Sequence, residues 1–350
     1  MPPRSSRYLR NVTNRELNRA VLLRQGLIEP FDEPLPRVLE HVSGIQAQYA
    51  PSMYVGLWSR TRSLRRDALT RALEDRSVVQ GTLLRGTIHL VSREDYWTFA
   101  TAVRQQLRQY FITVSKGHPS GSELAAAAEK VAAALREGPL RQSEIDALIG
   151  RRARAGINMV LDLVRVPPSG TWDRRKADLH LDARSWIGPP DVEPAEARLL
   201  LVRRYLSGFG PATTADIANW AGLPVRTVSG ALASIDHVTY RAEDGATLID
   251  LPGSPLPDAD VPVPVRFLPT WDATLLVHAR RAEILPEALR PRVFSIKNPH
   301  SVATFLMDGS VAGTWRYRDG RIELAEFEPL PERLHRTIVD ATEALAEFHR

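Results

Sequence analysis

A pattern that occurs three times constrains the fold of this chain more than any other feature: short helical segments followed by two strand-like segments joined by a turn. Helices followed by a β-ribbon are the order of a winged helix. In the first occurrence, apolar spacing predicts helices and then a ribbon over residues 14–25, 36–42, 67–75 and 78–91. An aromatic-rich helix over 94–110 completes a first predicted module at residues 1–116.

The pattern returns in residues 117–190 and 191–252, after Gly/Pro-rich breaks at 117–122 and 189–194. The second module has predicted helices and a ribbon at 123–136, 141–149, 151–164 and 166–187. The third has helices and a wing at 195–209, 214–221, 225–232 and 240–251. Its wing carries Glu243 and Asp244, so we expect a structural role for this module. Identity among the three segments is too low to establish repeats.

Residues 253–350 change to a β pattern with a final amphipathic helix over 332–349. Strands are predicted at 265–269, 274–277, 301–307, 308–317 and 322–327. Asp308-Gly309 and Asp319-Gly320 are two-residue hairpin signals. The expected fold is therefore α+β, with tandem winged-helix modules followed by a small antiparallel β-barrel-like domain.

Composition limits the chemistry. The 350 residues include no cysteine, which excludes disulfides, thiolate metal sites and a cysteine nucleophile, and fits a reducing compartment. Residues 1–10 lack a long apolar stretch, so we expect neither a signal peptide nor a membrane span, and a cytoplasmic protein. The nine histidines form no HExxH pattern, and no Walker loop or GxSxG elbow is present. We therefore expect no metal and no cofactor.

Charge is unevenly distributed. Residues 1–110 hold 17 basic and 10 acidic side chains, residues 111–190 hold 12 and 9, and residues 191–350 hold 17 and 22. The first half is thus the predicted polyanion-binding part. Of the 46 cations, 42 are arginine, which suits bidentate phosphate contacts, although a GC-rich coding sequence explains such an excess equally well.

Two glutamines, Gln46 and Gln48, lie one residue apart at the end of a predicted element, before Pro51. In an extended segment residues i and i+2 point the same way, so the two carboxamides can converge on one target. An amide does not ionise near neutral pH, so the pair can position a water or a polar ligand but cannot act as an ordinary general base. The alternative is that both side chains only fix a loop backbone.

The segments 44–52, 57–60 and 84–91 resemble the AlkZ-like winged-helix DNA glycosylases, and the similarity extends through most of the chain. In that family a Gln-apolar-Gln motif is the catalytic signature, and here it is Gln46-Ala47-Gln48. The sister YcaQ branch has Asp at the second polar position, where this chain has Gln48. The resemblance implies a monomer acting on double-stranded DNA with N7-alkylated purines, including interstrand crosslinks left by bifunctional antibiotics. It also implies a basic concave surface and a β-hairpin in the minor groove, which we place at Asp308-Gly309.

The remaining site predictions come from position. We expect DNA contacts from three places: the predicted strand of the first module, the third helix of the second module and the wing of the second module. In this order, the residues are Arg85 and His89, then Arg151, Arg152 and Arg154, then Arg174, Arg175 and Lys176. Thr87 and Asp272 are expected to support the active site. The alternatives are that residues 84–91 make ordinary wing pairing with His89 partly buried, and that Asp272 caps a turn.

A second function remains open at this stage: a non-enzymatic winged-helix DNA-binding or regulatory protein. It would need a recognition helix with base-reading side chains, and the helix over 225–232 offers only Arg226, Thr227 and Ser229.

Overall fold

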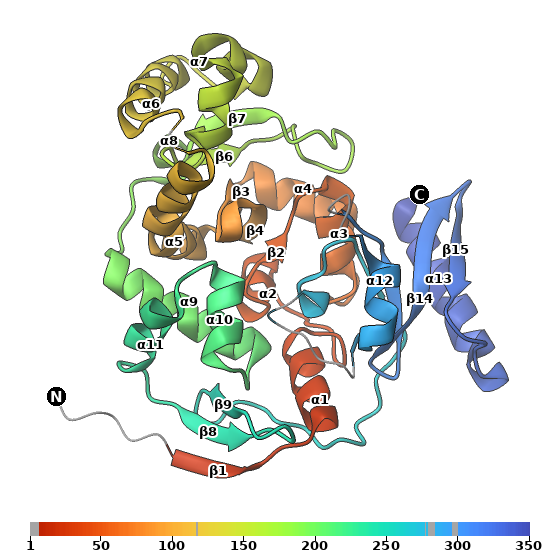
Figure 1. Ribbon diagram of the computed structural model, residues 1–350. Coiled ribbons are helices and arrows are strands. Elements are labelled where there is room, and N and C mark those ends of the chain that lie inside the picture. Colours follow the sequence, from red (N-terminus) through yellow and green to blue (C-terminus); the bar gives the residue numbers. More distant parts are fainter. Residues whose placement is uncertain (1–6, 117, 277, 279–283, 296–299) are drawn as a thin grey trace.

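A computed structural model describes residues 7–116, 118–276, 278, 284–295 and 300–350. Its α+β architecture has three helix-and-ribbon units arranged around a central sheet, with the C-terminal domain beside them (Figure 1). The predicted order of winged-helix elements is confirmed. The division of the chain at residues 116, 190 and 252 remains a prediction, because the largest hydrophobic core contains residues from all four segments.

The first unit contains one more helix than we predicted. Its elements are α1 (Asn14–Arg24), α2 (Leu35–His41), β2 (Ile45–Gln46), α3 (Ala50–Trp58), α4 (Arg66–Glu74), β3 (Val78–Thr82), η1 (Leu84–Gly86), β4 (Ile88–Ser92) and α5 (Arg93–Val114). Helix α3 begins where we expected Pro51 to end an element. Pro51 lies in the first helical turn, where its missing N–H is not needed, and the extended residue is the N-cap Tyr49, two positions earlier.

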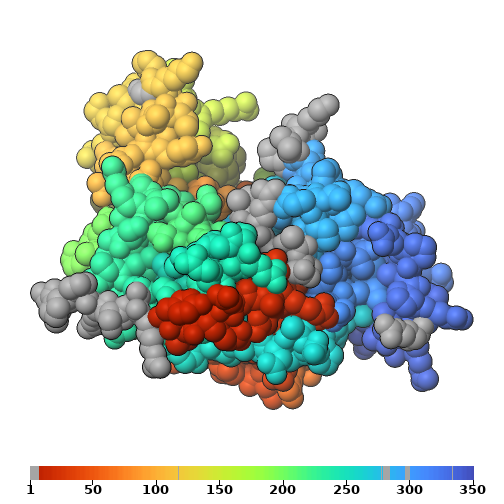
Figure 2. All heavy atoms as spheres, turned by 60° about the horizontal axis from the view of Figure 1, so that its bottom comes forward, coloured from red at the N-terminus to blue at the C-terminus, as the bar shows by residue number. Residues whose placement is uncertain are grey.

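The second unit is α6 (Gly121–Leu135), β5 (Leu140–Arg141), α7 (Gln142–Ile157), β6 (Leu163–Arg165), β7 (Leu179–Asp182) and α8 (Ala183–Ile187). Two helices predicted over 141–164 are one element with a break at Gly150 (φ 75°), and this element ends at Ile157. The unit has its own small core between α6 and α7. In the space-filling view it stands out from the body, separated from the C-terminal domain by a notch (Figure 2).

The ribbons of the first two units join in one sheet of order β2-β4-β3-β6-β7-β5. The junction is the antiparallel pairing of β3 with β6, in which Gln80 lies opposite Arg165 and Gly81 opposite Val164. Gly81 is required there because a Cβ would come within 2.6 Å of the Tyr96 ring. The two wings are therefore one continuous surface.

The third unit has the expected helix-turn-helix. It consists of α9 (Pro194–Phe209), α10 (Thr214–Ala221), α11 (Val225–Leu232) and the ribbon β8 (Val238–Arg241) and β9 (Thr247–Asp250). Thr213 caps α10 in a capping box with Asp216, and Gly222 ends it in the left-handed conformation. The strand β1 (Arg7–Asn11) pairs in parallel with β8, an addition that we did not predict.

The C-terminal domain contains an open sheet and not a closed barrel. Its strands β10 (Arg266–Leu268), β13 (Thr304–Met307), β14 (Ser310–Arg318) and β15 (Arg321–Glu326) pair in that order. The expected strand over 274–277 is instead the 3₁₀ helix η2 (Ala273–Leu275), with Val277 outside the described residues. A strand that would help to close the sheet is thus missing from the described part.

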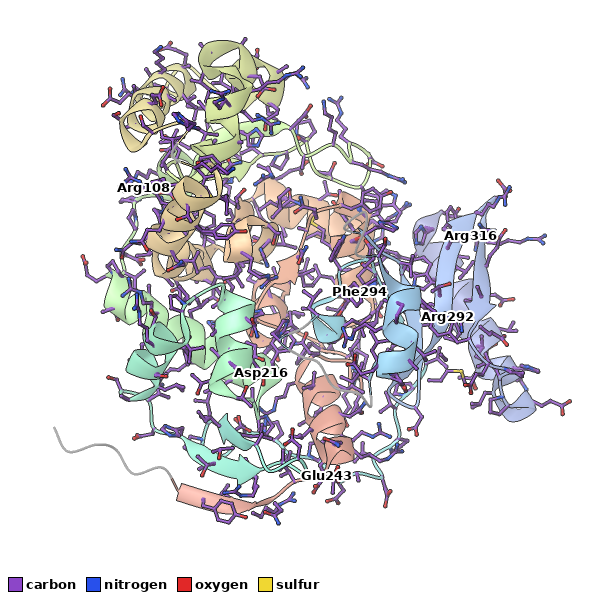
Figure 3. The ribbon with its side chains drawn as sticks, viewed as in Figure 1. Arg108, Asp216, Glu243, Arg292, Phe294 and Arg316 are labelled. Carbon is purple, nitrogen blue, oxygen red and sulfur yellow. The ribbon has the colours of Figure 1, made fainter. Side chains whose placement is uncertain are left out.

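Short elements and one long helix complete this domain: η4 (Glu287–Leu289), α12 (Arg290–Val293), β11 (Phe294–Ser295), β12 (His300–Ser301), η5 (Glu332–Leu334) and α13 (His335–His349). Phe348 of α13 belongs to a second core with α2, α3 and α4. Figure 3 shows Arg316 on β14 and Arg292 on α12 in this domain, with Arg108 of α5 on the opposite side of the molecule.

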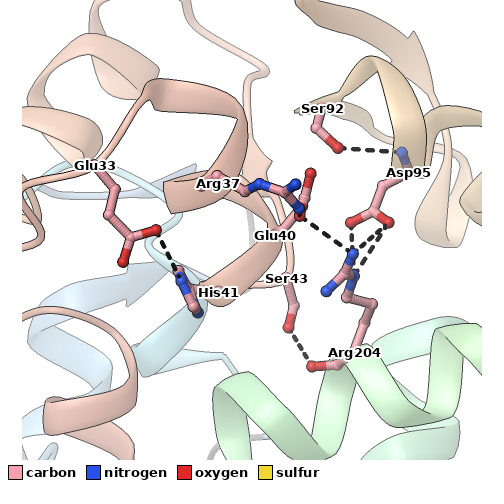
Figure 4. Close-up of polar contacts among 8 residues, drawn as sticks. All are labelled: Glu33, Arg37, Glu40, His41, Ser43, Ser92, Asp95 and Arg204. Atoms are coloured by element: carbon pink, nitrogen blue, oxygen red, sulfur yellow. Dashed lines mark hydrogen bonds and ion pairs between the residues drawn. The ribbon is translucent and has the colours of Figure 1, made fainter.

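A polar network fastens the third unit to the first (Figure 4). The Arg204 guanidinium of α9 lies 2.8 Å from an Asp95 oxygen at the start of α5 and 3.5 Å from Glu40 of α2. The backbone carbonyl of Arg204 also accepts from the Ser43 hydroxyl, at 2.5 Å. Burial raises the pKa of Asp95 despite the opposing effect of Arg204. The loop that leads from α2 into β2 is thereby held against α9.

Candidate functional site

Gln46 and Gln48 lie on a short extended segment between α2 and α3. Gln46 is opposite His89 in the antiparallel pairing of β2 with β4, and the Ala47 N–H donates to the Ile88 carbonyl at 2.7 Å. Ala47 is 1% exposed, whereas Gln46 is half-buried and Gln48 exposed. The alternation directs Ala47 into the core and leaves the two glutamines accessible.

Each carboxamide is oriented by the segment between β3 and β4. The Gln48 Oε1 accepts from the Ile88 N–H at 3.1 Å, and the Gln46 Oε1 accepts from the Arg85 guanidinium at 3.5 Å. A backbone N–H and a guanidinium can only donate hydrogen bonds, so the oxygen of each glutamine side chain, and not its NH₂ group, must face them. Each oxygen keeps a second lone pair, and each NH₂ group stays available as a donor.

Arg85 and Thr87, predicted as a DNA contact and as active-site support, make contacts within the protein. Arg85 lies in η1 with φ 55°, and its guanidinium donates to the Trp220 carbonyl of α10 as well as to Gln46. The Thr87 hydroxyl donates to the Leu84 carbonyl at 3.1 Å. Burial lowers the pKa of Arg85 to about 10. Arg85 therefore braces the motif and does not extend toward solvent as a DNA contact would.

His89 is 3% exposed, so in this structure it cannot reach a phosphate as predicted. Its Nδ1 lies 3.1 Å from the Thr87 carbonyl. Burial, and secondarily the Arg85 cation, lowers the pKa of His89 to about 3. His89 is therefore a neutral side chain beneath Gln46, and the alternative of wing pairing with a buried histidine describes it better.

A groove of about 340 Å³ begins at Tyr49, the residue directly after the motif, and neither Gln46 nor Gln48 is among the described residues that line it. Its lining comes from the start of α3, the loop before β7, the strand β14 and the end of α13, and includes Tyr49, Ser52, Arg175, Trp315, Tyr317 and His349. The Arg175 guanidinium donates to the Tyr49 hydroxyl at 3.2 Å, across the gap between the first two units. No Asp or Glu is among the described residues that line the groove.

The basic residues of the second unit separate into two groups. Arg174, Arg175 and Lys176 are exposed on the loop between β6 and β7, where they line a second groove of about 440 Å³. Lys176 pairs with Asp178 at 2.8 Å. Helix α7, which carries Arg151, Arg152 and Arg154, lies at the outer end of the unit, away from β2 (Figure 1), and Arg154 pairs with Asp146 at 3.1 Å. Of the two groups, the loop cluster is the one that the structure brings next to the motif, through the contact of Arg175 with Tyr49.

The Asp272 carboxylate is buried in contacts with Arg60 and Thr274. Its carboxylate is 3% exposed and accepts from the Arg60 guanidinium at 2.9 Å. It also accepts from the backbone N–H and hydroxyl of Thr274, at 3.1 and 2.8 Å, which makes it the cap of η2. The prediction of active-site support is replaced by the alternative, an aspartate that caps a turn and fastens the C-terminal domain to the end of α3.

The Asp308-Gly309 hairpin forms as predicted, but its tip is occupied. Arg15 and Arg19 of α1 lie 2.8 and 2.7 Å from the two Asp308 oxygens. A Cβ on Gly309 would contact the Arg19 side chain at 2.7 Å. This turn is therefore packed against α1 and is a poor candidate for a minor-groove probe.

Among the described residues, no group of three or more His, Cys, Asp or Glu side chains is arranged to bind a metal ion. The described helices also include none with the length and apolarity needed to span a bilayer.

Comparison with known proteins identifies the family. A family model described as DNA glycosylase AlkZ-like matches residues 39–348, which is most of the chain. This protein belongs to the AlkZ-like DNA glycosylases. It is an enzyme of DNA repair that hydrolyses N-glycosyl bonds. The resemblance seen in the sequence is thus confirmed.

This AlkZ-like glycosylase also shares its fold with a solved relative. The Streptomyces sahachiroi DNA glycosylase AlkZ superposes with a TM-score of 0.78 at 17% sequence identity, over 97% of each chain. No curated protein sequence matched significantly.

The groove of this AlkZ-like glycosylase was not predicted from its sequence. The usable signal was Tyr49, an aromatic residue directly after Gln48, which the structure shows to be exposed. The approach of His349 and Trp315 to Tyr49 had no such signal, because about 270 to 300 residues separate them in the chain.

Proposed function

We propose that this glycosylase hydrolyses the N-glycosidic bond of N7-alkylated purines in double-stranded DNA, with Gln46 and Gln48 as the catalytic pair. The observation that carries the proposal is a pair of uncharged carboxamides, oriented by Arg85 and the Ile88 N–H, directly before Tyr49, where a groove without a carboxylate in its described lining begins. His89, which is paired with Gln46 across the strands, is buried and has a depressed pKa, and burial also lowers the pKa of His349 in the groove to about 4. A carboxylic acid that could protonate the leaving base is missing from the described lining of the groove, although His300 and His349 belong to it.

The lesion makes a general acid unnecessary. An N7-alkylated purine already carries a positive charge, so when its C1′–N9 bond breaks the bonding electrons neutralise the base. The sugar becomes oxocarbenium-like, as in glycoside hydrolysis, and a water oxygen adds to C1′ while its proton passes to solvent. Gln46 and Gln48 would position this water and direct the remaining lone pairs of their oxygens toward the growing positive charge.

The groove that begins directly after the motif is formed by six separate stretches of the chain, at 49–55, 175, 269–270, 300–303, 315–317 and 349. A base that is covalently linked to the opposite strand cannot rotate freely into a deep pocket, so an open site favours such substrates. We include interstrand crosslinks in the proposed substrate class for this reason. Arg174, Arg175 and Lys176 would hold the phosphate backbone beside the groove.

The experiment is release of free base from a duplex that contains N7-methylguanine. We expect the wild type to release 7-methylguanine, and the double variant Gln46→Ala/Gln48→Ala to lower the single-turnover rate by about 100-fold or more, the scale found for loss of positioned polar groups. Gln109→Ala, at an exposed position on α5, is the matched control and should leave the rate unchanged. A wild type that binds the duplex but releases no base would refute the proposal.

A further inference from the structure

Arg85 has a backbone conformation that needs an explanation. Its φ of 55° and ψ of 17° lie in the left-handed region, although it is not glycine. This conformation is unfavourable for a non-glycine residue, so contacts elsewhere must compensate for it. The compensating contacts are those of the Arg85 guanidinium.

On one side, Arg85 is anchored to the third winged-helix unit. Its Nη1 donates to the Trp220 carbonyl in the last turn of α10. Gly222, with φ 69°, follows as the C-cap of that helix, and a Cβ there would lie 3.1 Å from the Arg85 Cγ. The C-terminal end of a helix carries partial negative charge, so it stabilises a cation placed against it.

On the other side, Arg85 reaches the catalytic motif. Its Nη2 donates to the Gln46 Oε1 at 3.5 Å. Among the described residues no carboxylate pairs with Arg85, so the guanidinium divides its donors between the helix end and the carboxamide. A guanidinium is planar and holds its N–H groups at fixed angles, which fixes the orientation of the group that accepts from it.

We propose that Arg85 is a positioning residue for the glycosylase reaction, which transmits the position of the α10 C-terminus to the Gln46 carboxamide. The third winged-helix unit then serves as the support of the catalytic motif, a role that its acidic wing does not suggest. The inference rests on the proposed catalytic role of Gln46. The dipole of α10 partly offsets the charge of Arg85, which keeps a full cation from opposing the positive charge that grows on the sugar.

The test measures the single-turnover rate of 7-methylguanine release and the Kd for the same duplex in wild type, Arg85→Met, Arg85→Lys and Gly222→Ala. We expect Arg85→Met to lower the rate by about 10- to 100-fold, the equivalent of one hydrogen bond to a charged group, with a Kd within about threefold of wild type. Arg85→Lys should recover part of the rate. Gly222→Ala should lower the rate per folded molecule less than Arg85→Met, because its Cβ displaces the Arg85 stem but leaves the guanidinium in place, while the strain of alanine at φ 69° lowers stability.

Arg165→Met is the matched control. Arg165 on β6 is buried, whereas Arg85 is half-buried, and burial lowers the pKa of Arg165 to about 10 as well, but its Nη1 donates to the Thr82 hydroxyl at 3.1 Å. Loss of this guanidinium should reduce the unfolding temperature and leave the rate per folded molecule unchanged. Equal rate losses in Arg165→Met and Arg85→Met would overturn the inference, as would a weaker Kd with an unchanged rate for Arg85→Met.

A double-mutant cycle separates this inference from the proposed function. If Arg85 acts through Gln46, then Arg85→Met causes no further loss of rate in a Gln46→Ala background. Full additivity of the two losses would refute the inference while leaving Gln46 catalytic. A Gln46→Ala variant as active as wild type would overturn both the catalytic role of Gln46 and the positioning role of Arg85, and an inactive wild type would overturn the proposed function itself.

Discussion

At the scale of single residues, the two glutamines differ in how they are held. Gln48 is exposed and its oxygen is bound by a backbone N–H, whereas Gln46 is half-buried and its oxygen is bound by a side chain. A backbone donor on a paired strand moves little, so Gln48 depends on β4 alone. Gln46 depends on Arg85 and through it on a helix from a distant part of the chain.

The burial of His89 leads to a prediction about how folding stability depends on pH. With a pKa near 3 when folded and an ordinary value of 6.5, His89 binds a proton in the unfolded chain long before it does so in the folded one. The stability that depends on its neutral form is present above pH 6.5 and is lost as pH falls toward 3, at roughly 1.4 kcal/mol per pH unit.

Between pH 7.5 and pH 5.5, the unfolding free energy of wild type should fall by about 1.4 kcal/mol more than that of His89→Gln, because glutamine does not titrate. Urea unfolding at both pH values measures the difference. His335→Gln, at an exposed position on α13, should behave as wild type. Equal losses in wild type and His89→Gln would show that His89 is not the buried neutral group seen here.

At the scale of elements, the end of α3 is joined to the C-terminal domain by one buried ion pair. The side chains of Arg60 and Asp272 are 2% and 3% exposed, and their closest atoms are 2.9 Å apart. The Ser52 and Thr270 hydroxyls, 2.7 Å apart, make a second link near the start of the helix. These links hold Tyr49 and the C-terminal sheet on opposite sides of the groove.

We expect Asp272→Ala to lower the unfolding free energy by about 3 to 5 kcal/mol, because it leaves the Arg60 cation buried without its partner. Thermal or urea unfolding measures the change. Asp319→Asn, which removes the charge of a pair whose aspartate is 91% exposed and keeps a residue that tolerates the turn φ of 48°, should change stability by less than about 1 kcal/mol. A variant of Asp272 that keeps its stability but loses base release would instead support the active-site role that the sequence analysis offered beside the turn cap.

At the scale of the whole molecule, the joined sheet places the basic loop of the second unit beside the motif of the first. Arg175 contacts Tyr49, and Arg174 and Lys176 lie next to it on the same loop. The third unit instead presents Glu243 and Asp244 in its wing. The two exposed wings therefore differ in sign, and only one suits a phosphate backbone.

We expect the triple change of Arg174, Arg175 and Lys176 to Gln to weaken duplex binding and to reduce the slope of log Kd against log salt by about 0.9 for each phosphate that is no longer neutralised. Binding titrations at several salt concentrations measure the slope. Arg241→Gln, in the wing of the third unit, should leave the slope unchanged. A slope that is the same for the triple variant and wild type would remove this loop from the DNA interface.

The sequence by itself determined the features that depend on neighbours in the chain. Helical and alternating apolar spacing predicted the winged-helix elements, Asp-Gly pairs predicted hairpins at 308–309 and 319–320, and Gly222 predicted the end of α10. The motif Gln46-Ala47-Gln48 was found on an accessible edge because alternation is a property of two residues and needs no distant partner.

Only the tertiary structure decided which side chains those local elements bring together. Arg85 meets Trp220 across 135 positions, Arg60 meets Asp272 across 212, and Arg175 meets Tyr49 across 126. The packing of the elements also decided that the side chains of His89 and Asp272 are buried. Such contacts depend on how whole elements pack, and local spacing carries no information about packing between segments so far apart. The sequence thus located the glutamines, and the fold determined what holds them.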